Sequence, residues 1–186
     1  MPIAIGAKPD HDFSEPLGML SDCHRRIERF LAVMQEVSDR SEDGRLTDES
    51  REPFERALEY FRTGAPRHTA DEEESLFPRL RRLNAPESGS LLVQIERLES
   101  EHTRAQALHA AVEEIGARWL ADSVLVPQER AMLAHTLEEL GRLYAAHIAL
   151  EDEQVFPLAG RILPGDEKRQ IGIEMAARRS SSLSPS

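Results

Sequence analysis

The chain has 186 residues, of which 34 are acidic and 23 are basic, so its net charge is −11 with neutral histidines. That length suits one domain, and the acidic excess argues against a nucleic-acid partner, which needs concentrated positive charge. No apolar run reaches the ~20 residues of a transmembrane helix, and residues 1–10 lack the pattern of a secretory signal. The single cysteine excludes an internal disulfide. We therefore expect a cytoplasmic protein without a membrane partner.

Four stretches of the chain place apolar residues at helical spacing, and none alternates apolar and polar residues as a strand would. The expected helices cover residues 15–37, 47–83, 91–120 and 127–159. Thr47 is the predicted N-cap of the second helix, and Gly64 and Pro66 are expected to kink or break it. Leu92 is placed on the buried face of the third helix, and Pro127 suits the first turn of the fourth.

These helices and their short connections predict an all-α protein, an antiparallel up-and-down four-helix bundle with a short C-terminal fifth helix. The bundle is expected to fill residues 14–160, after an irregular lead at 1–13. The fifth helix is expected within 161–179, and the Ser/Pro-rich residues 180–186 form a predicted disordered tail.

The most informative feature is an internal repeat. Residues 68–78 and 147–157 share the pattern H-x-A-x-E-x-E-x-x-F-P without a gap. The histidine and the first glutamate of each copy are four residues apart, so they lie on one helix face about one turn apart. These pairs are His68 with Glu72 and His147 with Glu151. One histidine precedes each copy at nearly the same distance, His24 by 44 residues and His102 by 45.

The four histidines are expected at one level of the bundle, because two residues of a helical hairpin lie level when the turn is midway between them. The midpoint of His102 and His147 falls in the connection 121–127, and that of the first His/Glu pair and His102 falls in 84–89. The midpoint of His24 and the first pair agrees with its loop within about one turn. Six polar groups buried together without a metal would carry a heavy desolvation cost, which favours a metal centre over a purely structural bundle.

Four imidazoles and two carboxylates are too many for one tetrahedral zinc ion, and thiolates are missing. Mixed nitrogen and oxygen donors in a bundle fit two iron ions, with manganese less favoured. Two carboxylates can bridge such a pair, and each ion then takes two histidines. A ferritin-like site needs Glu-x-x-His on two helices, and here only Glu99 to His102 fits that pattern, so that alternative is disfavoured.

The sequence resembles the hemerythrin-like (HHE cation-binding) proteins over about residues 15–160. The resemblance rests on the segment LSDCHRRIE around His24, on the two His/Glu pairs, and on Glu101 with His102. It implies a four-helix bundle that holds a non-haem di-iron centre. In that centre His24 and His68 bind one ion, His102 and His147 bind the other, and Glu72 and Glu151 bridge them with an oxo, hydroxo or water ligand.

Hemerythrins that carry oxygen have a fifth histidine four residues after the one on the third helix, where this chain has Gln106. The set of four histidines and two glutamates looks more like bacterial di-iron proteins linked to repair of iron centres under nitrosative stress. We expect a monomeric or homodimeric protein that binds O2, NO or peroxide at a vacant position, or stores or senses iron and oxygen. A di-iron enzyme acting on peroxide or in repair is the alternative.

The sequence also predicts positions or roles for five other side chains. His109 is expected to pack near the site or to support a ligand rather than to bind metal. Tyr144 is expected in the core or at its rim, in a position from which it could line the pocket, and Cys23 is expected to be a buried, inert thiol. Glu28 is a candidate hydrogen-bond partner for a ligating imidazole, and His135 is expected to be a surface or packing residue.

Overall fold

The structure is a computed structural model that describes residues 10–41, 43–83 and 88–180. Its helices are α1 (Pro16–Arg40), α2 (Asp48–Thr63), α3 (Ala65–Ala70), α4 (Phe77–Arg82), α5 (Ser88–Asp122), α6 (Pro127–Leu150), α7 (Phe156–Ile162) and α8 (Gly165–Ser180). Two π-helical segments, η1 (Asp71–Leu76) and η2 (Glu151–Val155), connect α3 to α4 and α6 to α7.

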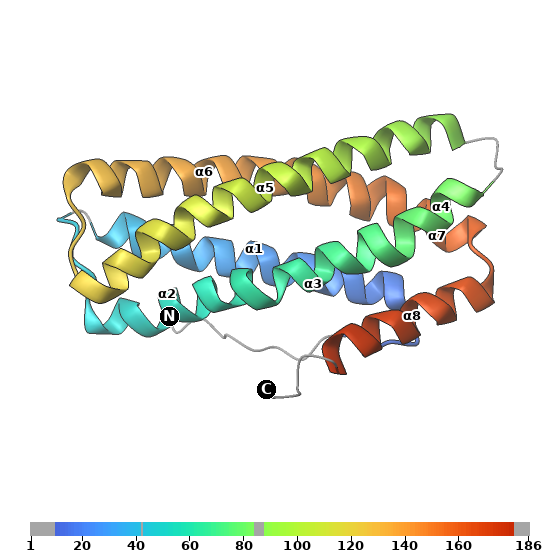
Figure 1. Ribbon diagram of the computed structural model, residues 1–186, viewed down its shortest axis with the longest axis horizontal. Coiled ribbons are helices and arrows are strands. Elements are labelled where there is room, and N and C mark those ends of the chain that lie inside the picture. Colours follow the sequence, from blue (N-terminus) through green and yellow to red (C-terminus); the bar gives the residue numbers. More distant parts are fainter. Residues whose placement is uncertain (1–9, 42, 84–87, 181–186) are drawn as a thin grey trace.

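The helices form long rods that lie side by side along the long axis (Figure 1). They are α1, the run from α2 to α4, α5, and the run from α6 to α7. The short helix α8 lies beside α1 and η1 near one end. The described residues contain helices and a single isolated β-bridge but no strand, so the prediction of an all-α bundle is confirmed.

Local sequence signals account for most helix starts. The Thr47 side chain accepts a hydrogen bond of 3.2 Å from the Ser50 N–H, as expected of an N-cap. Pro127 stands in the first turn of α6, where no intrahelical donor is needed. Pro66 likewise stands in the first turn of α3, so it interrupts the second rod without ending it.

Helix ends extend beyond the predicted bounds. α1 ends at Arg40, three residues after Val37, and α5 continues to Asp122. Apolar periodicity marks only the part of a helix that is buried, so polar end turns escape it. The expected buried position of Leu92 is wrong, because this side chain is 38% exposed while its neighbour Leu91 is buried. The two lie about 100° apart around α5.

Two apolar clusters fill the bundle. The loop-end cluster includes Phe54, Trp119 and Leu137. The α8-end cluster includes Phe77 and Ile171. Along each rod, a level of polar side chains, called the polar level below, separates the two clusters. Burial of both clusters supplies most of the driving force for folding.

The polar level sits where each rod passes from one cluster to the other. On α1, Leu20 belongs to the α8-end cluster and Ile27 to the loop-end cluster, with His24 between them. On α5 the same change occurs between residues 98 and 105, on either side of His102. The histidines therefore lie at a shared depth, as the loop midpoints predict.

The connections after α1 and after α5 meet and close one end of the bundle. The Leu46 N–H donates to the Ser123 carbonyl and the Leu125 N–H to the Gly44 carbonyl, each at 2.9 Å. Gly44 has a φ of 78° and its Cα faces the Leu125 carbonyl so closely that a side chain would clash. The buried Trp119 indole also donates to the Gly44 carbonyl.

The fifth helix of the prediction is present as α8. Ile171 and Met175 are buried in the α8-end cluster, whereas Ile173 is 61% exposed. Arg79 of α4 pairs with Glu167 and Glu174 of α8 at 2.6 and 2.8 Å.

Parts of the predicted irregular segments fall within the structure. Within residues 10–15, Phe13 and Ser14 form a turn, and Ser180 still belongs to α8. Most of the predicted lead, residues 84–87 and the predicted disordered stretch 181–186 lie outside the described residues. Within the described ranges no helix is both long and apolar enough to cross a lipid bilayer.

Candidate metal centre

Both copies of the sequence repeat adopt the same local structure. His68 lies in α3 and His147 in α6, each in the last turn before a π-helical segment. Glu72 is the second residue of η1 and Glu151 is the first residue of η2. Single π-helical turns are rare and are frequent at functional sites, and here they occur twice, at corresponding positions.

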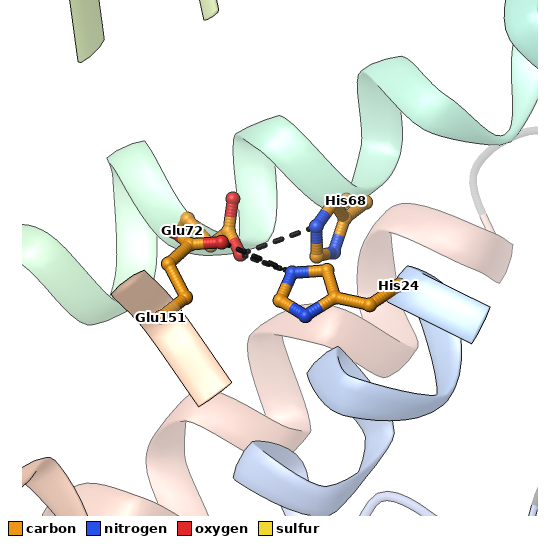
Figure 2. Close-up of side chains that lie close together, drawn as sticks. All are labelled: His24, His68, Glu72 and Glu151. Atoms are coloured by element: carbon orange, nitrogen blue, oxygen red, sulfur yellow. Dashed lines mark ion pairs between the residues drawn. The ribbon is translucent and has the colours of Figure 1, made fainter. Parts of the chain in front are cut away.

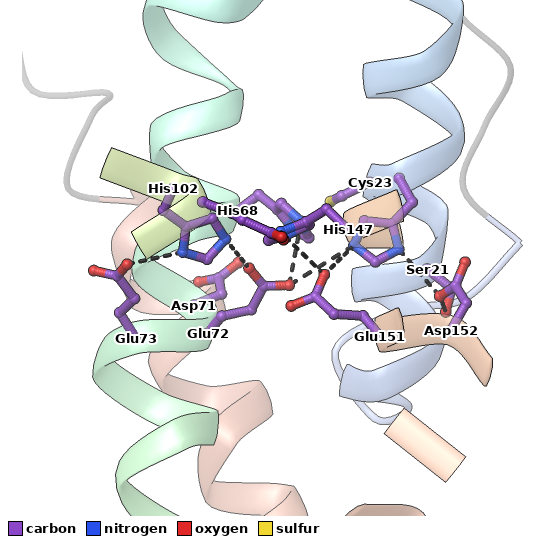
Figure 3. A network of polar contacts seen from close by, with 12 residues as sticks. Ser21, Cys23, His68, Asp71, Glu72, Glu73, His102, His147, Glu151 and Asp152 are labelled. Carbon is purple, nitrogen blue, oxygen red and sulfur yellow. Dashed lines mark hydrogen bonds and ion pairs between the residues drawn. The ribbon is translucent and has the colours of Figure 1, made fainter. Parts of the chain in front are cut away.

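The six predicted side chains converge at the middle of the bundle (Figures 2 and 3). They form two groups in which one donor atom from each residue lies within 4.8 Å of all the others. The groups are His24, His68, Glu72 and Glu151, and Glu72, His102, His147 and Glu151. Both glutamates belong to both groups, and none of the six side chains is more than 8% exposed.

Each glutamate lies close to one histidine of each group. The Glu72 carboxylate is 3.2 Å from Nε2 of His68 and 3.3 Å from Nε2 of His102. The Glu151 carboxylate is 3.0 Å from Nε2 of His24 and 3.2 Å from Nε2 of His147. The two carboxylates thus stand between two pairs of imidazoles that come from four different rods.

The converging atoms lack hydrogen bonds. All four carboxylate oxygens of Glu72 and Glu151, and Nε2 of His24, His68 and His102, are buried without a hydrogen-bond partner among the described residues. Each such atom costs roughly 1–3 kcal/mol. A pair of cations would satisfy all of them at once, so the donor set fits a metal centre.

The side chains of this cluster shift one another's pKa values. Burial opposes a charged His24, yet its hydrogen bond with Asp152 and the nearby Glu151 raise its pKa to about 12. Burial also opposes a charged Glu72, but the surrounding histidines hold the pKa of this carboxyl well below its ordinary value. His68 differs, because its burial lowers its pKa to about 4. Metal binding would release the imidazole protons.

Three carboxylates, whose role the sequence analysis missed, support the imidazoles from behind. Figure 3 labels two of them, Glu73 and Asp152. Each accepts a hydrogen bond from the Nδ1 that faces away from the centre, which turns Nε2 inward. The pairs are His24 with Asp152 at 3.0 Å, His102 with Glu73 at 2.8 Å and His147 with Glu101 at 3.0 Å. Each supporting residue is the sequence neighbour of a predicted ligand on another rod. His68 Nδ1 has no such partner in the described part of the chain.

Glu101→Gln should weaken metal binding about tenfold or more, because outer partners of ligating imidazoles typically contribute that much. The amide keeps the shape of the side chain but removes the charge that makes His147 a better donor. Affinity can be measured by competition with a chromophoric chelator. Glu96→Gln, an exposed glutamate on the same helix, is the matched control and should change nothing; equal affinities for both variants would contradict the supporting role.

A cavity of about 240 Å³ lies beside the six side chains and is lined by all four histidines. Exposed residues of α3 and α5, among them Pro66, Thr103 and Gln106, form its outer part. Tyr144 lines it as predicted. Gln106 therefore borders open space beside His102.

The remaining expectations have mixed outcomes. Cys23 is buried, as predicted. His109 packs on the ring of Phe61 and borders the cavity without joining either donor group. Glu28 is exposed, so its candidacy as a hydrogen-bond partner is wrong. His135 is exposed, as expected.

The fold and this cluster define a cation-binding helical bundle built from histidines and carboxylates. A family model described as the hemerythrin HHE cation-binding domain matches residues 15–159, and the chain belongs to that family. A protein of Haemophilus influenzae described as uncharacterized is 30% identical over 168 residues, which cover 90% of this chain and 91% of that protein. The resemblance inferred from the motifs is confirmed.

Proposed function

We propose that this protein holds two non-haem iron ions and binds a small diatomic or peroxide ligand beside them. His24 and His68 would bind one ion and His102 and His147 the other. Glu72 and Glu151 would bridge the pair. The observation that carries the proposal is that two four-residue groups share both glutamates, which is the arrangement a bridged pair of ions needs.

The donor chemistry supports iron. Imidazole and carboxylate donors without a thiolate suit iron, with manganese next, and disfavour a structural zinc site. When bound, the ions would supply a redox-active, Lewis-acidic centre. The chain contributes the rest: the supporting carboxylates orient the imidazoles, the two apolar clusters flank the polar level, and the cavity gives a small molecule access to the histidines of both groups.

A di-iron enzyme that acts on peroxide, or in repair of iron centres, is the second candidate function. The exposed outer wall of the cavity at Thr103 and Gln106 favours it, because reactants can exchange with solvent there. Kinetic measurements, rather than the arrangement of the site, distinguish reversible binding from turnover.

The test is elemental analysis of the purified chain followed by spectroscopy of the reduced protein mixed with O2, NO or hydrogen peroxide. We expect two iron ions per chain, one for each donor group, and a new charge-transfer absorption with at least one of these reagents. Reversible spectra favour ligand binding, and sustained consumption of peroxide favours the enzyme. A chain that retains no transition metal after reconstitution with ferrous iron contradicts the proposal.

A further inference from the structure

We propose that the Tyr144 hydroxyl, positioned by His109, donates a hydrogen bond to the cavity ligand and makes the site selective for small anions over neutral diatomic molecules. The inference rests on the proposed function, because it concerns what binds beside the metal ions. It identifies the ligand class as an anion of two or three atoms, such as peroxide or azide.

Tyr144 is placed close to the centre. It lies on α6 one turn before His147, and the two ring centroids are 6.4 Å apart with an interplanar angle of 87°. The side chain is 8% exposed and lines the same cavity as the four histidines. An ordinary phenol has a pKa of about 10, so the hydroxyl is protonated at neutral pH and remains a donor.

Among the described lining residues, Tyr144 carries the only buried hydroxyl. The walls combine apolar residues such as Ile27 and Ala105 with the half-buried Thr69. Gln106 and Thr103 are exposed at the outer part of the cavity, and Glu73 already accepts the hydrogen bond from His102. Tyr144 thus presents a buried hydroxyl beside the four histidines, where a hydrogen bond to an anion is strong.

His109 determines where the O–H bond of Tyr144 points. Its Nε2 lies 2.8 Å from the Tyr144 oxygen, and its ring stacks on Phe61 with centroids 4.2 Å apart. Burial lowers the pKa of His109 to about 4, so the imidazole is neutral and carries one N–H. When that hydrogen is on Nε2, the imidazole donates to the phenol oxygen, and the phenol O–H is free to point elsewhere.

The pair therefore has two hydrogen-bond arrangements. In one, the phenol donates to the imidazole; in the other, the imidazole donates to the phenol and the phenol donates into the cavity. A ligand with a negative, strongly accepting atom stabilises the second arrangement. Neutral NO accepts weakly and gains little from it. Hydrogen bonds to charged acceptors are worth roughly twice those to neutral ones, which is the physical basis of the selectivity.

The experiment compares azide and NO binding to the iron-loaded protein. In Tyr144→Phe we expect the azide dissociation constant to rise roughly tenfold, as loss of a hydrogen bond to a charged group predicts, while NO affinity stays within about twofold because a neutral ligand loses little. The infrared stretch of bound azide should shift as well. Tyr60→Phe is the matched control: Tyr60 is also a tyrosine in the interior, but its hydroxyl contacts the Cys23 carbonyl and does not line the cavity.

Two His109 variants separate positioning from packing. His109→Leu should weaken azide binding in the same direction as Tyr144→Phe. His109→Gln, whose amide can still donate to the phenol oxygen, should retain most of the wild-type azide affinity. A packing role alone would not distinguish a leucine from a glutamine in this way.

Failure of this inference is distinguishable from failure of the proposed function. Unchanged azide affinity in Tyr144→Phe, with a full complement of iron, overturns the hydrogen-bond role and leaves the metal centre intact. Equal losses of azide and NO affinity overturn the selectivity. A wild-type chain that binds no iron overturns the proposed function itself.

Discussion

Glu72→Ala should leave the chain unable to hold either metal ion, whereas His68→Ala should remove only one. The two variants should differ because Glu72 contributes to both donor groups and His68 to only one of them. The symmetric experiment on the second repeat is Glu151→Ala against His147→Ala. Each variant is reconstituted with ferrous iron under anaerobic conditions, and its iron content per chain is measured after gel filtration.

The controls use residues of the same types outside the donor groups. Glu153→Ala changes an exposed glutamate two residues after Glu151, and His135→Ala changes an exposed histidine on α6. Both should keep the full iron content. Far-ultraviolet circular dichroism checks that the metal-free variants remain helical. A Glu72→Ala chain that keeps both ions would show that this carboxylate is not shared, and the bridged arrangement would have to be abandoned.

Much of the candidate site was predictable because the chain repeats itself. The four-residue spacing of His68 and Glu72 specifies a shared helix face, and the loop midpoints specify a shared depth. The structure agrees with both, since the donors fall on each rod between the two apolar clusters. Spacing within a helix and distance to a loop are local quantities, so a sequence expresses them directly.

The supporting carboxylates were not predictable in the same way. Asp152 meets His24 although 128 positions separate them. Its position next to Glu151 places it about 100° around the rod, which is where it must lie to reach a neighbouring rod. Glu28 had the more obvious spacing, one turn after His24, yet it faces solvent. Which rods are neighbours, and how each is rotated, decides such contacts.

The π-helical segments also escaped prediction. The residues of η1 and η2 have ordinary helical composition, and a wider turn leaves no mark on apolar periodicity over five or six residues. Their position nonetheless bears on the site, because both glutamates belong to them. Contacts from α8 hold η1 in place. We therefore expect these contacts to affect metal binding through Glu72.

Asp71→Ala should destabilise the protein by about 3 kcal/mol, the lower end of the cost of removing one partner of a buried ion pair. Asp71 is fully buried on η1 and pairs with Arg178 at 2.9 Å and Arg179 at 2.7 Å, both from α8. Its removal leaves two largely buried guanidinium groups without this carboxylate. Chemical denaturation of the metal-free protein measures the loss, and the iron affinity of the folded variant measures its effect on the adjacent Glu72.

Glu74→Ala is the matched control, because Glu74 is on the same segment and also pairs with Arg178, at 3.1 Å, but is 67% exposed. An exposed pair contributes about 0–1 kcal/mol, so this variant should be close to wild type in stability and iron affinity. If burial decides the energy, the two substitutions differ although both remove a carboxylate from the same arginine. Equal effects would mean that α8 is held to η1 by the apolar contacts of Ile171 and Met175, and that the arginines contribute little.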